Sequence, residues 1–95
     1  ENCQIEEGAQ IMAGVVLQSG ASIGKDTVIN TASTIDHDCV IGDSVWLSPG
    51  VTLCGSVNVG TRSYIGAGST IIQEINIGSY AVIAAGSTII RDVEQ

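Results

Sequence analysis

Aliphatic residues recur at every sixth position along this chain. Counted from Ile5, the series has no break: Ile5, Ile11, Leu17, Ile23, Ile29, Ile35, Ile41, Leu47, Leu53, Val59, Ile65, Ile71, Ile77, Ile83 and Ile89. A second series lies four residues after the first, and its members are small or aliphatic: Ala9, Val15, Ala21, Thr27, Ser33, Cys39, Val45, Val51, Val57, Ser63, Ser69, Ile75, Ala81, Ser87 and Val93. A period of six fits neither a helix nor a lone alternating strand. It predicts a solenoid of stacked repeats.

Glycine indicates where each repeat bends, because it adopts positive φ without steric cost. Half of the glycines lie three residues after the repeat aliphatic: Gly8, Gly14, Gly20, Gly50, Gly68 and Gly86. Aspartate tolerates the left-handed region better than most residues and shares this phase: Asp26, Asp38 and Asp92. We therefore expect the corners there. Gly55 alone lies two residues after the aliphatic, outside the phases of the other glycines.

One short strand and one corner per hexad predict a triangular coil of three hexads, about 18 residues, giving slightly over five coils. Successive coils would stack roughly 4.8 Å apart, with the aliphatic series lining the interior. Each buried aliphatic contributes on the order of 1.5–3 kcal/mol. Backbone entropy of roughly 1–2 kcal/mol per residue largely offsets this gain. We therefore expect a homo-oligomer that covers some of the flat faces.

Composition narrows the function classes. The 95 residues suffice for one domain, and 3 basic against 10 acidic residues provide no basic patch for nucleic acid. Apolar runs are too short to span a bilayer, and no segment is typical of a signal peptide, so we expect a cytoplasmic protein without a membrane partner. The 3 cysteines have no CxxC spacing, which predicts neither disulfides nor a metal site. The sequence begins with Glu1 and not with methionine, so it leaves open whether another domain precedes these residues.

The repeat pattern [LIV]-[GAED]-x-x-[STAV]-x resembles that of the hexapeptide-repeat acyltransferases. "INTASTIDHDCVIGDSVWLSPGVTLCGSVNVG", residues 29–60, is similar to the sialic acid O-acetyltransferases and the bacillosamine-type nucleotide-sugar N-acetyltransferases. "IGAGSTIIQEINIGSYAVIAAGSTIIRDV", residues 65–93, resembles the coenzyme A-binding coils of that group. The resemblance implies an all-β, single-stranded, left-handed parallel β-helix over residues 1–95, assembled as a homotrimer. The group's N-terminal sugar-nucleotide domain and its "GNPAK"-like C-terminal tail are not in the sequence.

The resemblance also implies an activity, the transfer of acetyl from acetyl-CoA to an amino or hydroxyl group of a sugar or nucleotide-sugar. The sequence leaves two other assignments to weigh. A non-catalytic trimeric scaffold, or a truncated acyltransferase domain, would keep the fold without the chemistry. A γ-type carbonic anhydrase needs several histidines around zinc, and this chain has 1 histidine.

His37 is the candidate general base. If positions about 18 apart stack, His37 lies one coil from Gly55, whose bare backbone admits substrate and whose amide can donate to an oxyanion. Asp38 follows in sequence, where it can hold the imidazole and raise its basicity. The resemblance implies the same roles, with direct attack on the thioester and no acyl-enzyme. The alternative is a solvated corner histidine, and we expect Asp36 to be a solvated corner charge.

Trp46 departs from the group it resembles. Many members carry a second histidine at this position, in an "HxSPG" setting, where it contacts the acetyl-thioester end of the cofactor. The sequence here reads "WLSPG". The indole N–H can only donate, so either the pocket has changed its acyl group or acceptor, or Trp46 packs on Tyr64 one coil later.

The candidates for holding acetyl-CoA are Trp46, at the position of the group's cofactor-contacting histidine, and several small and basic residues. Ala67 and Ala85 match cofactor-contacting positions of the group, and their size would let a pantetheine arm run along two coils. Arg62 and Arg91 are candidate phosphate partners, and Arg91 is preferred because it lies near the C-terminal end. Tyr80, one coil after Arg62, leaves open a surface cation–π pair instead.

A cysteine nucleophile is a weaker hypothesis. Cys39 belongs to the inward-facing series, and Cys54 has no base in its column. The sequence therefore favours direct transfer over a thiol mechanism.

Overall fold

A computed structural model describes residues 3–94, which form two-residue parallel strands in three sheets and contain no helix that could cross a membrane. Sheet A contains β1 (Gln4–Ile5), β4 (Ser22–Ile23), β7 (Val40–Ile41), β10 (Asn58–Val59) and β13 (Asn76–Ile77). Sheet B contains β2 (Gln10–Ile11), β5 (Val28–Ile29), β8 (Trp46–Leu47), β11 (Tyr64–Ile65) and β14 (Val82–Ile83). Sheet C contains β3 (Val16–Leu17), β6 (Thr34–Ile35), β9 (Thr52–Leu53), β12 (Thr70–Ile71) and β15 (Thr88–Ile89).

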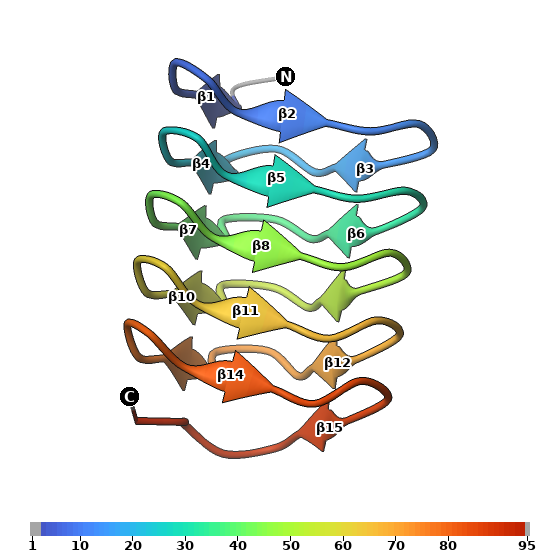
Figure 1. The fold of residues 1–95 in the computed structure, drawn as a ribbon, viewed down its shortest axis with the longest axis vertical. Helices are drawn as coiled ribbons and strands as arrows, with labels where there is room; N and C mark the ends of the chain where they lie inside the picture. The colour runs from blue at the N-terminus through green and yellow to red at the C-terminus, as the bar shows by residue number, and fades with distance from the viewer. Residues whose placement is uncertain (1–2, 95) are drawn as a thin grey trace.

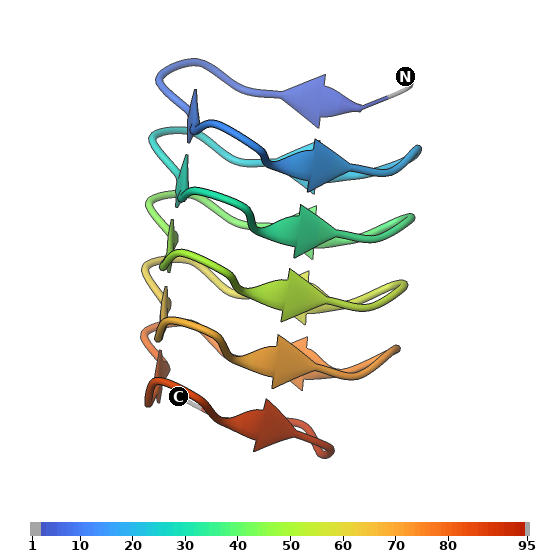
Figure 2. The same cartoon turned by 90° about the vertical axis from the view of Figure 1, so that its right-hand side faces the viewer.

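The strands wind into a β-helix, as the repeat predicts, and it is left-handed, as the family resemblance implies. In Figure 1 the chain crosses the front from left to right along β2, β5 and β8, returns behind from right to left, and descends. Figure 2 shows the same coils from the side, with the strands of each sheet one above another. The register is constant: Gln4 pairs with Ser22 and Tyr64 pairs with Val82. Positions one coil apart in sequence are therefore neighbours in space.

The interior is built from the two sequence series. Ile23, Ile35, Leu47 and Ile65 are completely buried, as are the small residues that follow four positions later. Polar members of the second series are satisfied by the next coil, for example by the Ser63 hydroxyl, which donates to the Gly78 carbonyl. The carbonyls that directly follow the strands provide these acceptors, and bonded hydroxyls are tolerated in the interior for that reason.

The interior prediction is wrong at the first coil. Ile5 is half exposed, and Ile11 and Leu17 are only partly buried. The physical reason is that a side chain in a β-helix is covered by the coils on both sides, and the first described coil has a neighbour on one side only.

The corners occur at the predicted phase. Positive φ angles are found three residues after the repeat aliphatic at six glycines and at Asp26, Ala32, Asp38, Ser44, Ser56, Arg62, Glu74 and Tyr80. A left-handed conformation costs a non-glycine residue roughly 1–2 kcal/mol. Arg62 and Tyr80 adopt this conformation despite the cost. The stacking of the coils therefore determines the corner geometry, and glycine only lowers its energetic cost.

The prism has three faces and three edges, which we name by their sheets. Edge A/B joins sheet A to sheet B, edge B/C joins B to C, and edge C/A joins C to the A strand of the next coil. The outward side chains of face B include Trp46 and Tyr64, and face C carries a threonine column: Thr34, Thr52, Thr70 and Thr88. Face A carries Asn58 and Asn76, whose amides hydrogen-bond at 2.8 Å.

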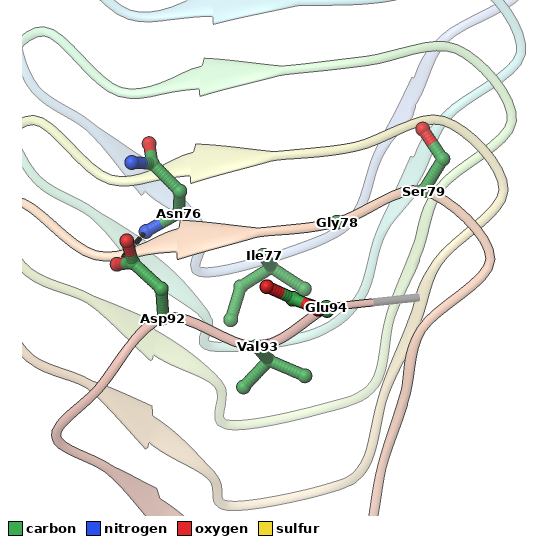
Figure 3. A pocket seen from close by; sticks show the side chains of 7 residues that line it. All are labelled: Asn76, Ile77, Gly78, Ser79, Asp92, Val93 and Glu94. Atoms are coloured by element: carbon green, nitrogen blue, oxygen red, sulfur yellow. Dashed lines mark hydrogen bonds between the residues drawn. The ribbon is translucent and has the colours of Figure 1, made fainter.

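A cavity of about 570 Å³ lies at the C-terminal end, between β13 and residues 92–94 (Figure 3). Val93 forms a bridge to Ile77, and the Asp92 carboxylate accepts the backbone N–H of Asn76 at 2.9 Å. None of the residues that the sequence analysis places in the active site lines this cavity.

Candidate active site

His37 lies on edge C/A, directly above the backbone of Gly55. A Cβ placed on Gly55 would be 2.6 Å from Nε2 and 2.7 Å from Cε1 of the imidazole, which is too close for any side chain. The out-of-phase glycine therefore makes room for the ring, and the ring covers the Gly55 backbone. The sequence predicts this juxtaposition from the coil length alone.

Asp38 occupies the corner next to His37, with φ at 60°. Its Oδ2 lies 3.2 Å from Nδ1 of the imidazole, and both side chains are exposed. A carboxylate can only accept, so this contact favours the tautomer with hydrogen on Nδ1. The lone pair of Nε2 then faces Gly55.

Gly20 is a site residue that the sequence analysis did not identify. A Cβ at Gly20 would clash with Oδ1 of Asp38, one coil later. Its missing side chain therefore lets Asp38 reach toward the imidazole. The signal was present in the sequence, since Gly20 precedes Asp38 by one coil length.

Asp36, expected to be a solvated corner charge, lies one residue before the corner and is bonded to the backbone there. Asp36 is partly buried, and its Oδ1 accepts the backbone N–H of His37 at 2.7 Å. A short polar side chain can fold back onto the following amide and stabilise a turn. Asp36 therefore fixes the backbone that presents the imidazole and does not contact the ring nitrogens.

A cavity of about 430 Å³ opens around this pair. The residues that line it are Asp36, His37, Cys54, Gly55, Ser56, Gln73 and Glu74. Gln73 and Glu74 were not identified from sequence, although Gln73 follows Gly55 by one coil length and so belongs to the column of His37. Three carboxylates stand in or beside the cavity, which gives it an acidic character.

The backbone of Gly55 lines this cavity, and only one of its two polar groups is paired within the described residues. Its carbonyl accepts the N–H of Glu74 at 2.9 Å. Within residues 3–94, by contrast, the Gly55 N–H is bonded to no acceptor. A backbone donor beside a basic imidazole is an arrangement suited to acyl transfer, because it can stabilise the negative charge that develops on a carbonyl oxygen.

The two cysteines of this region differ in environment. Cys39 is buried, its Sγ donates to the carbonyl of Cys54 at 3.1 Å, and burial raises the pKa of its thiol. Cys54 lies at the cavity wall and is partly exposed. Cys39 is thus a packing residue. Residues 3–94 hold no cluster of three or more metal-ligating side chains.

Three of the predicted cofactor residues occupy two different edges, and the fourth, Trp46, lies on face B. Ala67 and Ala85 are exposed one above the other on edge B/C, where the Ala67 carbonyl accepts the N–H of Gly86. Arg91 is exposed on edge C/A, in the same column as His37 and Gly55. Within one chain, face C separates the alanines from His37.

Trp46 and Tyr64 are ladder partners on face B. They are paired in register on β8 and β11, and 43% and 45% of their surfaces are exposed. The register confirms that Tyr64 lies one coil after Trp46, as the spacing predicts. Because about half of each ring faces solvent, the pair also offers an aromatic surface.

Known proteins share this repeat and this fold. The family model described as bacterial transferase hexapeptide (six repeats) matches residues 2–37 and 38–73. An acyl-[acyl-carrier-protein]–UDP-N-acetylglucosamine O-acyltransferase from Sinorhizobium fredii is 36% identical over 64 residues, which are 66% of this chain and 24% of that protein.

Two solved structures superpose closely. The GDP-perosamine N-acetyltransferase of Caulobacter crescentus, in complex with CoA and GDP-perosamine, has a TM-score of 0.87 at 29% identity, over 99% of this chain and 48% of that chain. The acetyltransferase domain of PglB from Neisseria gonorrhoeae, in complex with acetyl coenzyme A, has a TM-score of 0.87 at 32% identity, over 99% and 49%. The chain thus spans about half the length of these structures. On the family match over most of its length, the chain belongs to the bacterial transferase hexapeptide family.

Proposed function

We propose that this chain is the catalytic β-helix of an acetyl-CoA-dependent acetyltransferase that acts on an amino or hydroxyl group of a sugar or nucleotide-sugar. The observation that carries the proposal is the imidazole of His37, which is held by Asp38 and lies over the bare backbone of Gly55. The similar structures from Caulobacter and Neisseria, which contain CoA or acetyl-CoA, support the choice of cofactor.

In the proposed reaction, Nε2 of His37 removes a proton from the acceptor amine or hydroxyl as that group attacks the thioester carbonyl carbon. The oxyanion of the tetrahedral intermediate accepts a hydrogen bond from the Gly55 N–H. The intermediate expels the coenzyme A thiolate, which takes the proton from the imidazolium. Positioned acid–base catalysis contributes about 10²–10⁴-fold, and an oxyanion donor contributes about 10²–10³-fold.

The division of the predicted residues between two edges favours a homotrimer. A threefold axis parallel to the β-helix, with face C turned inward, would bring edge C/A of each subunit against edge B/C of its neighbour. His37, Gly55 and Arg91 would then meet the Ala67 and Ala85 edge of the adjacent subunit. The threonine column suits such a contact, because its side chains are short, uncharged and in register.

The direct test mixes the protein with acetyl-CoA and amino- or hydroxy-sugars and follows the release of free thiol. We expect His37→Ala to lower the rate about 10²–10⁴-fold, while Gln10→Ala, an exposed change on face B of the first coil, behaves as wild type. Equal rates for wild type and His37→Ala would remove His37 from the mechanism.

A mixing experiment tests the shared site. His37→Ala disables edge C/A, and Ala85→Trp blocks edge B/C, so each protein alone should be inactive. When trimers are reassembled from an equal mixture of the two variants, about a quarter of the sites should combine two intact edges and regain activity. No recovery would place both half-sites within one subunit.

The competing function is a scaffold without catalysis, which the indole of Trp46 at the family's second-histidine position favours. Titration calorimetry with coenzyme A separates the two functions. A saturable heat supports the transferase, and a flat titration supports the scaffold.

A further inference from the structure

Face B carries an aromatic pair that the proposed chemistry has not used. Trp46 and Tyr64 lie side by side in the ladder of β8 and β11, and each has nearly half of its surface exposed. Leu47 and Ile65, which follow them, are fully buried, so both rings project outward. The faces of aromatic rings carry negative charge density and attract the polarised C–H groups on one face of a sugar ring.

Arg62 stands at the border of the same face. It occupies the corner of edge A/B, two residues before Tyr64, which corresponds to roughly 6–7 Å along an extended backbone. Within residues 3–94, no carboxylate forms a salt bridge with its guanidinium. The nearby carboxylate of Asp43 accepts the backbone N–H of Lys25 at 2.8 Å. Arg62 is therefore available to an external anion, as one of 3 basic residues on a chain with a net charge of −7.

The aromatic pair lies level with the proposed reaction centre. The coil rises continuously, and Trp46 is nine residues after His37 and nine before Gly55. Its height along the axis is therefore midway between the two. In a parallel trimer with face C inward, the next subunit's His37 would reach edge B/C at this height, beside face B.

We propose that face B binds the acceptor as a sugar diphosphate, with the sugar ring on Trp46 and Tyr64 and the phosphates on Arg62. This inference rests on the proposed function. A ligand that covers the pair and also reaches Arg62 has its phosphates one ring away from its reacting group, as in a sugar diphosphate. The adenine of coenzyme A is separated from its thioester by the whole pantetheine arm.

The single tryptophan of the chain gives a direct readout, since all tryptophan emission comes from Trp46. The test is to titrate UDP-glucosamine, UDP, glucosamine and coenzyme A separately into the full chain and to follow this emission. UDP-glucosamine should produce a saturable change, and UDP and glucosamine should each bind at least tenfold more weakly. Coenzyme A should bind more weakly at this face than UDP-glucosamine.

Two variants separate the parts of the site. Arg62→Gln should weaken the binding of UDP-glucosamine and of UDP about tenfold and leave the binding of glucosamine unchanged. Tyr64→Ala should weaken the binding of UDP-glucosamine and of glucosamine about tenfold and leave the binding of UDP unchanged. Lys25→Gln removes the same charge from the same edge away from the aromatic pair, and it should titrate as wild type.

Three results would overturn the inference: constant emission with UDP-glucosamine, equal affinity for UDP and UDP-glucosamine, or wild-type titration by Arg62→Gln. Binding requires no turnover, so the thiol-release assay reports on the proposed function separately. Turnover with constant Trp46 emission contradicts this inference alone. A saturable change without turnover contradicts the proposed function alone.

Discussion

At the scale of single residues, the candidate site depends on missing side chains as much as on present ones. Gly55 leaves space for the imidazole of His37, and Gly20 leaves space for the carboxylate of Asp38. A side chain at either glycine would collide with the neighbouring coil. The two differ in backbone conformation, since Gly20 has a φ of 81° and Gly55 does not have a positive φ. Gly55 can therefore be substituted without backbone strain.

Gly55→Ala should reduce activity with little loss of stability. The new methyl group would meet the exposed and movable ring of His37, which must turn away. We expect the free energy of unfolding to change by less than about 0.5 kcal/mol, as for surface substitutions. The rate of acetyl transfer should fall about 10²-fold, because a misplacement of about 1 Å has that effect. Thiol release and urea denaturation measure the two effects, and full activity would exclude the ring-over-glycine geometry.

Asp38→Asn tests how the imidazole is held. Asparagine tolerates the left-handed corner, so the coil should keep its fold. The variant loses the charged acceptor of the Nδ1 hydrogen, and we expect kcat to fall about 10²–10⁴-fold while KM for acetyl-CoA stays unchanged. Steady-state kinetics on the variant and on Asp26→Asn, a corner aspartate on another edge, make the comparison. A loss shared by both variants would indicate a structural effect.

At the scale of the elements, each strand has two residues and no independent stability. What holds a strand is the strand above, the strand below and the aliphatic side chain between them. Burial is therefore complete in the middle coils and partial at the first, where Ile5 has a neighbour on one side only. An isoleucine at the same position of the repeat should therefore contribute much more to the free energy of unfolding in a middle coil than in the first.

Ile65→Ala should be strongly destabilising and Ile5→Ala should not. Ile65 is fully buried in β11, and removing its branch leaves a cavity that costs about 2–5 kcal/mol. Ile5 is half exposed in β1, and we expect a loss below about 1.5 kcal/mol. Urea denaturation monitored by circular dichroism compares the two, and equal losses would contradict the one-sided covering of the first coil.

At the scale of the whole molecule, the β-helix is a prism with extents of 28 × 20 × 20 Å and three flat faces of different chemistry. Face A presents amides, face B presents aromatic rings, and face C presents threonines. Apart from Trp46 on face B, the predicted catalytic and cofactor residues lie on the two edges that border face C. A neighbouring copy is what would unite them.

Thr70→Lys should convert the proposed trimer to monomers. Thr70 lies in β12 at the middle of the threonine column, and a threefold contact would bring three lysine charges together. Asn58→Lys on face A places the same charge on a face outside the contact and should leave the trimer intact. Size-exclusion chromatography with light scattering measures both masses. A trimer in both variants would show that face C is turned away from the axis.

The sequence by itself determined the fold, the register and the approach of His37 to Gly55, because a constant coil length converts sequence spacing into spatial neighbours. It also determined the corners, since their phase repeats with the period. Only the tertiary structure decided which groups meet at the site: the bond from Asp36 to the backbone of His37, the space that Gly20 leaves for Asp38, and the cavity wall formed by Gln73 and Glu74. The physical reason is that a periodic pattern fixes the position of each Cα, whereas the direction of a side chain depends on the atoms of the coils above and below it.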